Sequence, residues 1–255
     1  MKVQVATLAL FVSSLVPALA DDNAGGQTNN GTDPTRPPKM IAVSYGYTEL
    51  RNGFRQDLLE VLYQQPISAD GRTVAKVELP MVSTDVRGRS GFDLGDITLG
   101  LQRVAVVTPQ YGLVYKAEMV LNTANHIEQG TGKNVLKATA IYAKFLPGGA
   151  IFAPAIVHNE SLWGESGRAH VRLTTLDFYY VPKLGDPKTF VTFDPNVNFD
   201  WEGDKTYFGL AVTVGRAIGP AFGGNGQVYV KPSILAGSDR PGNWGLEVGF
   251  KVLGF

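Results

Sequence analysis

A period of two in the placement of apolar residues recurs along the chain from Met40 onward, and it limits the fold more than any other sequence feature. The clearest example is the stretch 111–122, where one face carries Tyr111, Leu113, Tyr115, Ala117, Met119 and Leu121 and the other carries Gly112, Lys116, Glu118 and Asn122. The side chains of a β-strand alternate between two faces in this way. From Met40 onward, no stretch shows the 3.6-residue apolar repeat of a helix that packs on a core. The pattern therefore predicts an all-β protein.

The alternating stretches number about twelve and are separated by turn signals. The clear ones are 73–81, 96–107, 111–122, 191–200, 208–214, 227–234 and 243–252, and the weaker ones are 41–50, 54–65, 135–145, 151–160 and 169–181. Asp70-Gly71, Pro147-Gly148-Gly149 and Gly203-Asp204 are typical of the turns between them. Strands joined by short turns are antiparallel neighbours, so we expect one up-and-down meander over residues 40–255. If 41–50 belongs to the preceding segment, ten strands remain.

The composition excludes several classes of function. The absence of cysteine excludes a disulfide scaffold, a thiolate metal site and a cysteine nucleophile. The 23 Lys and Arg residues balance 23 Asp and Glu residues, which argues against nucleic acid as a partner. Charged residues make up 18% of the chain, below the ~25% typical of soluble domains. This composition suits a β-rich protein with a partly apolar exterior.

The first 39 residues differ from the rest of the chain. Residues 1–20 combine a positive Lys2, a mostly apolar run and the small-residue site Ala18-Leu19-Ala20, which predicts a cleaved signal peptide and export. Residues 21–39 are almost entirely Asp, Asn, Gly, Thr and Pro. Such a segment buries too little apolar surface to offset its ordering entropy, so we expect a flexible polar tail. The alternative is a segment that folds back as a plug inside a pore, although its composition does not favour this.

Alternation alone does not say whether the apolar face covers a core or faces lipid, because a soluble lipocalin-like barrel or a sandwich has the same period. Three observations favour lipid. Charges lie in the middle of strands on one face, most runs reach the ~9 to 11 residues of a membrane strand, and aromatic residues such as Trp163, Trp201 and Trp244 lie toward strand ends. We therefore expect a single antiparallel transmembrane β-barrel in a bacterial outer membrane, closed so that every backbone group is paired.

In such a barrel the polar face of each strand lines the lumen. The residues predicted to face the lumen are Lys76, Glu78, Lys116, Glu118, His158, Glu160, Arg172, Asp194, Lys231, Glu247 and Lys251. Mixed charges of this kind create a transverse field that selects among solutes, without strong preference for one sign. Twelve strands enclose a narrow interior that long side chains can fill.

Several short motifs resemble a known family. They are Gly95-Asp96-Ile97, Gly130–Val135, Phe152–Ala155, Thr174–Val181, Asp194-Pro195, Asp200–Glu202, Lys231-Pro232, Asp239–Pro241 and Trp244–Gly249. They are similar to motifs of a family of bacterial outer-membrane barrels, described as transporters, that is associated with phenol meta-cleavage pathways. The resemblance implies a barrel and passage of small, including aromatic, compounds. It implies no catalytic residues.

The C-terminus also resembles bacterial outer-membrane barrels, many of which end in an aromatic residue, as Phe255 does here. Leu253 fits the apolar alternation counted back from Phe255, whereas Lys251 and Glu247 do not. A β-bulge near Leu253 would reconcile the two phases.

A second function class is a barrel-wall hydrolase that acts on lipid or lipopolysaccharide. His158 and Glu160 share a face, Ser161 and Ser166 follow, and His170 shares a face with Arg172. A hydroxyl, an imidazole and a carboxylate are the parts of a nucleophilic triad, but the sequence carries no wider hydrolase motif. A barrel with only a structural role is the third reading.

Metal sites are weakly supported. Zinc bound by His126, His158 and His170 requires three separate segments to converge, and a calcium site from Asp194, Asp200, Glu202 and Asp204 lacks the regular spacing of a known loop. We therefore predict no metal and no cofactor.

The sequence favours an exported, porin-like channel or transporter rather than an enzyme. Its expected partners are outer-membrane lipid and lipopolysaccharide, the barrel-assembly machinery and a small-molecule solute, with no nucleic acid.

Overall fold

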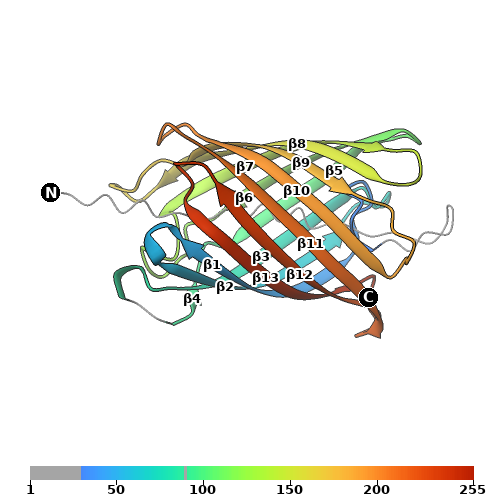
Figure 1. Cartoon of the computed structure of the whole chain (residues 1–255), viewed down its shortest axis with the longest axis horizontal. Helices are drawn as coiled ribbons and strands as arrows, with labels where there is room; N and C mark the ends of the chain where they lie inside the picture. Colours follow the sequence, from blue (N-terminus) through green and yellow to red (C-terminus); the bar gives the residue numbers. More distant parts are fainter. Residues whose placement is uncertain (1–29, 89–90) are drawn as a thin grey trace.

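The computed structural model describes residues 30–88 and 91–255, and these form one closed β-barrel whose strands are inclined to the barrel axis (Figure 1). The predicted signal peptide and residues 21–29 lie outside the described residues. The sheet contains 13 strands, of which β4 (Asp93–Leu94) has 2 residues and only extends the edge of β3. The other twelve form the barrel, so the all-β prediction is confirmed.

The twelve barrel strands correspond closely to the alternating stretches of the sequence. They are β1 (Met40–Leu50), β2 (Arg55–Pro66), β3 (Thr73–Thr84), β5 (Thr98–Val107), β6 (Tyr111–Val120), β7 (Lys133–Phe145), β8 (Ile151–Gly164), β9 (Arg172–Val181), β10 (Thr189–Asp200), β11 (Lys205–Ala221), β12 (Gly224–Ala236) and β13 (Gly242–Leu253). The stretch 41–50 is a full strand, so twelve strands is correct and ten is not.

Each strand pairs antiparallel with its neighbours in sequence, and the first strand closes the barrel on the last. The closing ladder runs from Met40 opposite Leu253 to Glu49 opposite Trp244 without a break in register. The bulge expected near Leu253 is therefore absent from this ladder, and Leu253 is buried with Met40, Ala42 and Leu62. Of the two sets of alternating residues near the C-terminus, the set that contains Leu246 and Val248 faces outward.

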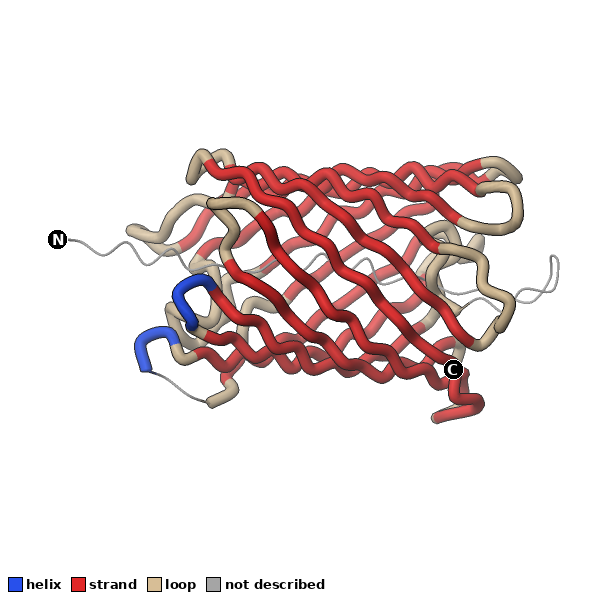
Figure 2. The backbone as a smooth tube through the Cα atoms, in the orientation of Figure 1, coloured by secondary structure: helices blue, strands red, loops and turns tan. Residues whose placement is uncertain are grey.

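The two ends of the barrel differ in their connections. We call the end where β1 begins and β13 finishes the terminus end, and the opposite end the loop end. The connections at the terminus end are 67–72, 108–110, 146–150, 182–188 and 222–223, whereas the loop end carries the longer segments 85–97 and 121–132. The 3₁₀ turns η1 (Arg51–Gly53) and η2 (Val86–Gly88) both lie at the loop end (Figure 2). Within the described part of the chain, no helix is long and apolar enough to cross a membrane.

The exterior of the barrel is apolar. Large hydrophobic side chains are exposed from β1 round to β13, including Val43, Leu101, Ile156, Leu210 and Val248. A monomeric soluble protein rarely exposes a continuous apolar patch larger than a few hundred Å². Aromatic pairs lie near both ends of the strands, among them Tyr47–Trp244 and Phe199–Trp201 toward the loop end and Tyr111–Tyr142 and Tyr180–Phe193 toward the terminus end.

Residues 30–39, which the sequence predicted to be part of a flexible tail, pack inside the barrel at the terminus end, and we call them the strap. Gly31, Thr32, Pro34, Thr35, Pro37 and Pro38 are all buried. Wall side chains from β2, β5 and β9 hydrogen-bond to the strap. The tail prediction is therefore wrong for these residues, because polar contacts with the wall replace the apolar burial that the strap lacks.

Candidate functional site

The lumen is the candidate site, because polar and charged side chains gather on the inner face of the wall. On β6, Glu118 is 3% exposed while the neighbouring Tyr115 is 51% exposed. On β10, Asp194 and Asn198 are buried while Phe193 is exposed. Burial of a charge without a partner is costly, so the partners of these groups decide what the lumen can do.

A row of residues crosses four adjacent strands on the inner face of the wall, and we call it the charged row: Lys76, Gly100, Glu118 and Lys137. Lys76 Nζ donates to Glu118 Oε1 across the intervening strand β5. The other oxygen of Glu118 lies 3.2 Å from Lys137 Nζ, and Lys76 also lies 2.7 Å from Glu78. Both oxygens of Glu118 therefore bind a lysine.

Gly100 is the residue of β5 that makes this row possible. A Cβ at this position would lie 3.1 Å from Glu118 Cγ and 3.3 Å from Lys76 Cε. Because glycine carries no side chain, Lys76 and Glu118 can meet over the β5 backbone although their strands are not neighbours.

Lys116 is a further lysine beside the charged row. It lines a small pocket together with Gln64, Gln102 and Glu118. Three lysines, Lys76, Lys116 and Lys137, lie on this part of the wall with three acidic residues, Glu60, Glu78 and Glu118. The basic and acidic residues of this group are therefore equal in number on this side of the lumen.

The opposite part of the wall holds a second set of charges. Lys231 and Glu247 are direct partners across β12 and β13, with Nζ and Oε2 3.7 Å apart. Tyr229 donates a 2.6 Å hydrogen bond to Glu247. Lys251 Nζ lies 4.8 Å from the centre of the Phe190 ring, a cation–π contact.

Two carboxyl groups on β9 and β10 also face this part of the lumen. Asp177 is 0% exposed and Asp194 is 7% exposed. Neither oxygen of Asp177, nor Oδ1 of Asp194, receives a hydrogen bond from the described residues. Acidic and basic residues therefore lie on both sides of the lumen.

The structure places most of the residues predicted to line the lumen on inward-facing positions. Those are Lys76, Glu78, Lys116, Glu118, Asp194, Lys231, Glu247 and Lys251, all in the same phase of their strands as buried neighbours. Sequence reasoning missed Glu60, Gly100, Asp177 and Tyr229. Gly100 and Asp177 lie in alternating stretches of the sequence, in the phase of the polar residues.

His158, Glu160 and Arg172 are placed on the outer face, so the prediction that they line the lumen is wrong. The inward phase of β8 is occupied instead by Ala153, Ala155, Val157, Asn159 and Ser161, which are all buried. On this strand both faces are apolar toward the terminus end, where Phe152 and Ile156 face outward, and both faces are polar toward the loop end.

These outward residues form a connected group with Thr174 and Trp201, which we call the outer cluster. His158 Nδ1 lies 2.9 Å from Thr174 Oγ1, and the Trp201 indole donates to the same hydroxyl at 2.8 Å. Glu160 lies 3.4 Å from His158 and 3.5 Å from Arg172. The cluster lies level with the Phe199–Trp201 pair, a position that suits amphipathic and polar groups at an interface.

The hydrolase hypothesis gains one contact from the structure. Ser161 Oγ lies 3.3 Å from His170 Nδ1, but it also accepts a hydrogen bond from the Val171 N–H. Glu160, the nearest acid in the sequence, faces outward and binds His158 and Arg172. Among the described residues, no group of three or more His, Asp or Glu side chains is placed to hold a metal ion.

The long connections at the loop end are bound tightly to each other. Asp96 accepts hydrogen bonds from the N–H groups of Thr123, Ala124 and Thr131. Arg168 donates to the carbonyls of Ile127, Gly130 and Thr131. Burial lowers the pKa of Arg168, which nevertheless stays charged at neutral pH. These bonds fix the rim of the lumen.

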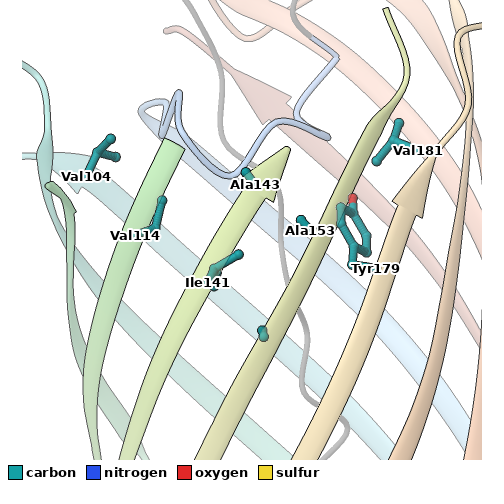
Figure 3. Packing of buried hydrophobic residues seen from close by; sticks show 8 residues of the cluster. Val104, Val114, Ile141, Ala143, Ala153, Tyr179 and Val181 are labelled. Carbon is teal, nitrogen blue, oxygen red and sulfur yellow. The ribbon is translucent and has the colours of Figure 1, made fainter. Parts of the chain in front are cut away.

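The terminus end of the lumen has an apolar inner wall instead of a charged one. It consists of Val104, Val114, Ile141, Ala143, Ala153, Ala155, Tyr179 and Val181, on strands β5 to β9 (Figure 3). The strap crosses this part of the lumen, with Thr32 bound to Tyr179 and Thr35 packed on Gly112. Sequence reasoning missed this wall because its residues occupy the polar phase of their strands.

Comparison with solved structures finds outer-membrane barrels of the same architecture. An outer-membrane channel from Pseudomonas putida F1 superposes with a TM-score of 0.62 at 13% identity, covering 85% of this chain and 95% of that one. The NanC porin gives 0.61 at 8% identity, covering 83% and 98%, and the translocator domain of the autotransporter NalP from Neisseria meningitidis gives 0.52 at 12%, covering 88% and 91%. Identities this low establish the shared fold alone. No family model and no curated protein matches the sequence.

Proposed function

We propose that this chain is an outer-membrane channel that passes small solutes through its polar lumen. The observation that carries the proposal is the charged row, which lies inside a closed barrel whose exterior is apolar. Buried charges need water or partners, and an apolar exterior needs lipid. The likeness to an outer-membrane channel and to a porin supports the same reading.

The proposal includes an orientation and a class of solute. Outer-membrane barrels have short periplasmic turns and longer external loops, so the terminus end faces the periplasm and the loop end faces outward. The mixed charges of the lumen favour polar and ionised small solutes, and the family resemblance adds aromatic compounds to those worth testing. We also propose that the outer face contacts lipopolysaccharide and that the barrel-assembly machinery folds the chain.

The test is expression of the full chain followed by fractionation and reconstitution. We expect recovery in the outer membrane, a gel mobility that changes on heating, and discrete conductance steps in planar bilayers. A protein that is recovered in the periplasm and stays soluble without detergent would contradict the membrane assignment. A folded barrel that inserts but carries no current would contradict the channel.

A hydrolase is the second candidate, and the contact between Ser161 and His170 is the observation in its favour. Its test is release of fatty acid from vesicles that contain lipopolysaccharide and phospholipid. We expect no release above that of a heat-denatured sample. Release that is lost in both Ser161→Ala and His170→Ala would establish the hydrolase instead.

A further inference from the structure

We propose that the inner wall at the terminus end is a binding site for an extended, proline-rich peptide segment, and that the strap is its resident ligand and closes the lumen at this end. The binding site stands on the contacts below. The closure rests in addition on the proposed channel function.

The wall supplies hydrogen-bond donors at three places around the lumen. Gln64 Nε2 on β2 donates to Pro38 O at 3.0 Å, and Gln102 Nε2 on β5 donates to Pro34 O at 3.1 Å. Tyr179 Oη on β9 donates to Thr32 O at 3.3 Å. Gln64, Gln102 and Tyr179 are 4%, 8% and 4% exposed with the strap in place, so water is largely excluded from these donors and the strap carbonyls satisfy them instead.

Several hydrogen-bond donors of the strap find acceptors within the strap itself. Its three prolines have no N–H to satisfy. The N–H and the hydroxyl of Thr35 both donate to Asp33 Oδ1, at 2.9 Å and 2.7 Å, and the Arg36 N–H donates to Asp33 O. The carbonyls of Thr32, Pro34 and Pro38 accept from the wall, so this part of the strap is complementary to a wall that presents donors.

The shape of the wall also fits the strap. A Cβ built on Gly112 of β6 would overlap Thr35 Cγ2 and lie 3.3 Å from Thr35 Cβ. Glycine at this inward position therefore provides the space that Thr35 fills. The apolar wall of β5 to β9 lies around this contact, where small side chains such as Ala143 and Ala153 leave room for a peptide.

One end of the strap is fixed to the barrel. Lys39 Nζ lies 4.4 Å from the centre of the Phe255 ring, the Gly254 N–H donates to Lys39 O at 2.9 Å, and Met40 begins β1. A segment joined to its site by a short connection has an effective concentration in the millimolar range. Modest contacts therefore keep the strap bound, and the loss of one or two of them releases it without unfolding the barrel.

The contacts span the lumen. Passing along the strap from Pro38 to Thr32, the contacts move from β2 to β5 and β6 and then to β9, which lies on the far side of the barrel from β1. The strap thus lies across the path that a solute would take between the charged row and the terminus end.

The position of the strap is tested with the full chain carrying Thr35→Cys and Gly112→Cys, because the protein has no other cysteine. Disulfides need Cβ atoms about 3.8 Å apart, near the separation found here. We expect the folded protein to form this disulfide under mild oxidation, detected by mass spectrometry. A control with Thr35→Cys and Thr213→Cys, on β11, should not. Failure of the first pair to cross-link in the folded barrel would overturn the binding site.

Closure is tested on the same protein in planar bilayers. The oxidised form should conduct less than the reduced form, by about twofold or more, since a segment across a 12-strand interior occupies much of its section. Gly112→Val should conduct more than the unmodified chain, whereas Gly46→Val should not, because a Cβ at Gly46 meets only Leu58 Cβ at 4.0 Å. Equal conductance of the oxidised and reduced forms overturns closure while leaving the channel intact. Absence of conductance in every variant overturns the channel, and cross-linking then still reports on the binding site.

Discussion

In the charged row the side chains of the wall bind one another, whereas around the strap the side chains of the wall bind another segment of the chain. Glu118 is held by Lys76 and Lys137, all three from barrel strands. Gln64, Gln102 and Tyr179 are held by the strap. The charged row therefore finds its bonding partners within the barrel strands. The donors at the terminus end find theirs only when the strap is in place.

The two regions should therefore affect different properties: the charged row should affect the stability of the barrel, and the strap should affect the opening of the lumen. Bonds between strands are lost only when the barrel unfolds, so a change there should lower the free energy of unfolding. Bonds to the strap are lost in a local event that leaves the strands paired, so a change there should alter the population of an open state. The predictions below compare the two regions.

The largest effect is expected for Glu118→Gln. The change leaves Lys76 and Lys137 without their shared carboxylate, with side chains only 13% and 12% exposed. Removal of one partner from a buried ion pair costs about 3 kcal/mol, with somewhat less expected where water reaches the pair. The free energy of unfolding in urea, followed by tryptophan fluorescence in lipid vesicles, should fall by roughly 2–3 kcal/mol.

The matched control is Glu160→Gln on the outer face. Glu160 also has two partners, but its side chain is 41% exposed, and exposed pairs contribute about 0.5 kcal/mol or less. Similar losses in the two variants would show that the charged row is not a stabilising feature of the lumen.

A smaller effect is expected for Gln102→Leu, and it should appear in a different measurement. The hydrogen bond to Pro34 O is lost, which is worth about 1 kcal/mol or a few-fold change in population. Hydrogen exchange of the Thr35 and Arg36 amides should accelerate by roughly three- to tenfold, while exchange in β5 and β6 stays unchanged. Faster exchange throughout those strands would mean that the strap and the barrel unfold together.

The smallest effect is expected at a turn outside both regions. Asp70, in the 67–72 connection, accepts hydrogen bonds from Ser68 Oγ, Arg103 Nη1 and the Arg72 N–H, which hold the pKa of its carboxyl well below its usual range. Because the pKa of Asp70 is lower in the folded protein, its carboxylate stabilises the turn fully at pH values above the unfolded-state pKa of about 3.9. This contribution is lost as the pH falls toward the folded-state pKa.

The carboxyl titration of Asp70 by NMR should therefore have its midpoint below 3.9. In Arg103→Gln the midpoint should move upward, while conductance at neutral pH stays the same because the turn touches neither the strap nor the charged row. A midpoint unaffected by Arg103→Gln would leave Ser68 and the backbone as the only causes.

The sequence predicted the barrel because alternation is a local property of each strand. The stretch 111–122 contrasts Tyr115 and Met119 with Lys116 and Glu118, so its two faces could be told apart without a structure. Stretch 151–160 offers no such contrast, since Ala155 and Val157 lie on one face and Phe152 and Ile156 on the other. There the polar residues His158 and Glu160 indicated the wrong face.

The strap and the charged row could not be predicted from local pattern. The strap has no periodic apolar residues, and its partners Gln64, Gln102 and Tyr179 come from three distant strands. The charged row depends on the register that brings Gly100 between Lys76 and Glu118. The register between β3, β5 and β6 is set when the whole barrel closes, so no single stretch of sequence reveals it.

The central claim is that the polar face of the strands meets water and the apolar face meets lipid, and two adjacent residues of β11 test it most directly. Thr213 is on the inward phase and Val214, on the outward phase, is 43% exposed. Because the chain has no cysteine, Thr213→Cys and Val214→Cys each carry a single thiol. In planar bilayers a charged, membrane-impermeant thiol reagent should modify Thr213→Cys and change its conductance, and should leave Val214→Cys unaltered. Modification of Val214→Cys with protection of Thr213→Cys would show that the two faces are reversed and that the barrel encloses a core instead of a channel.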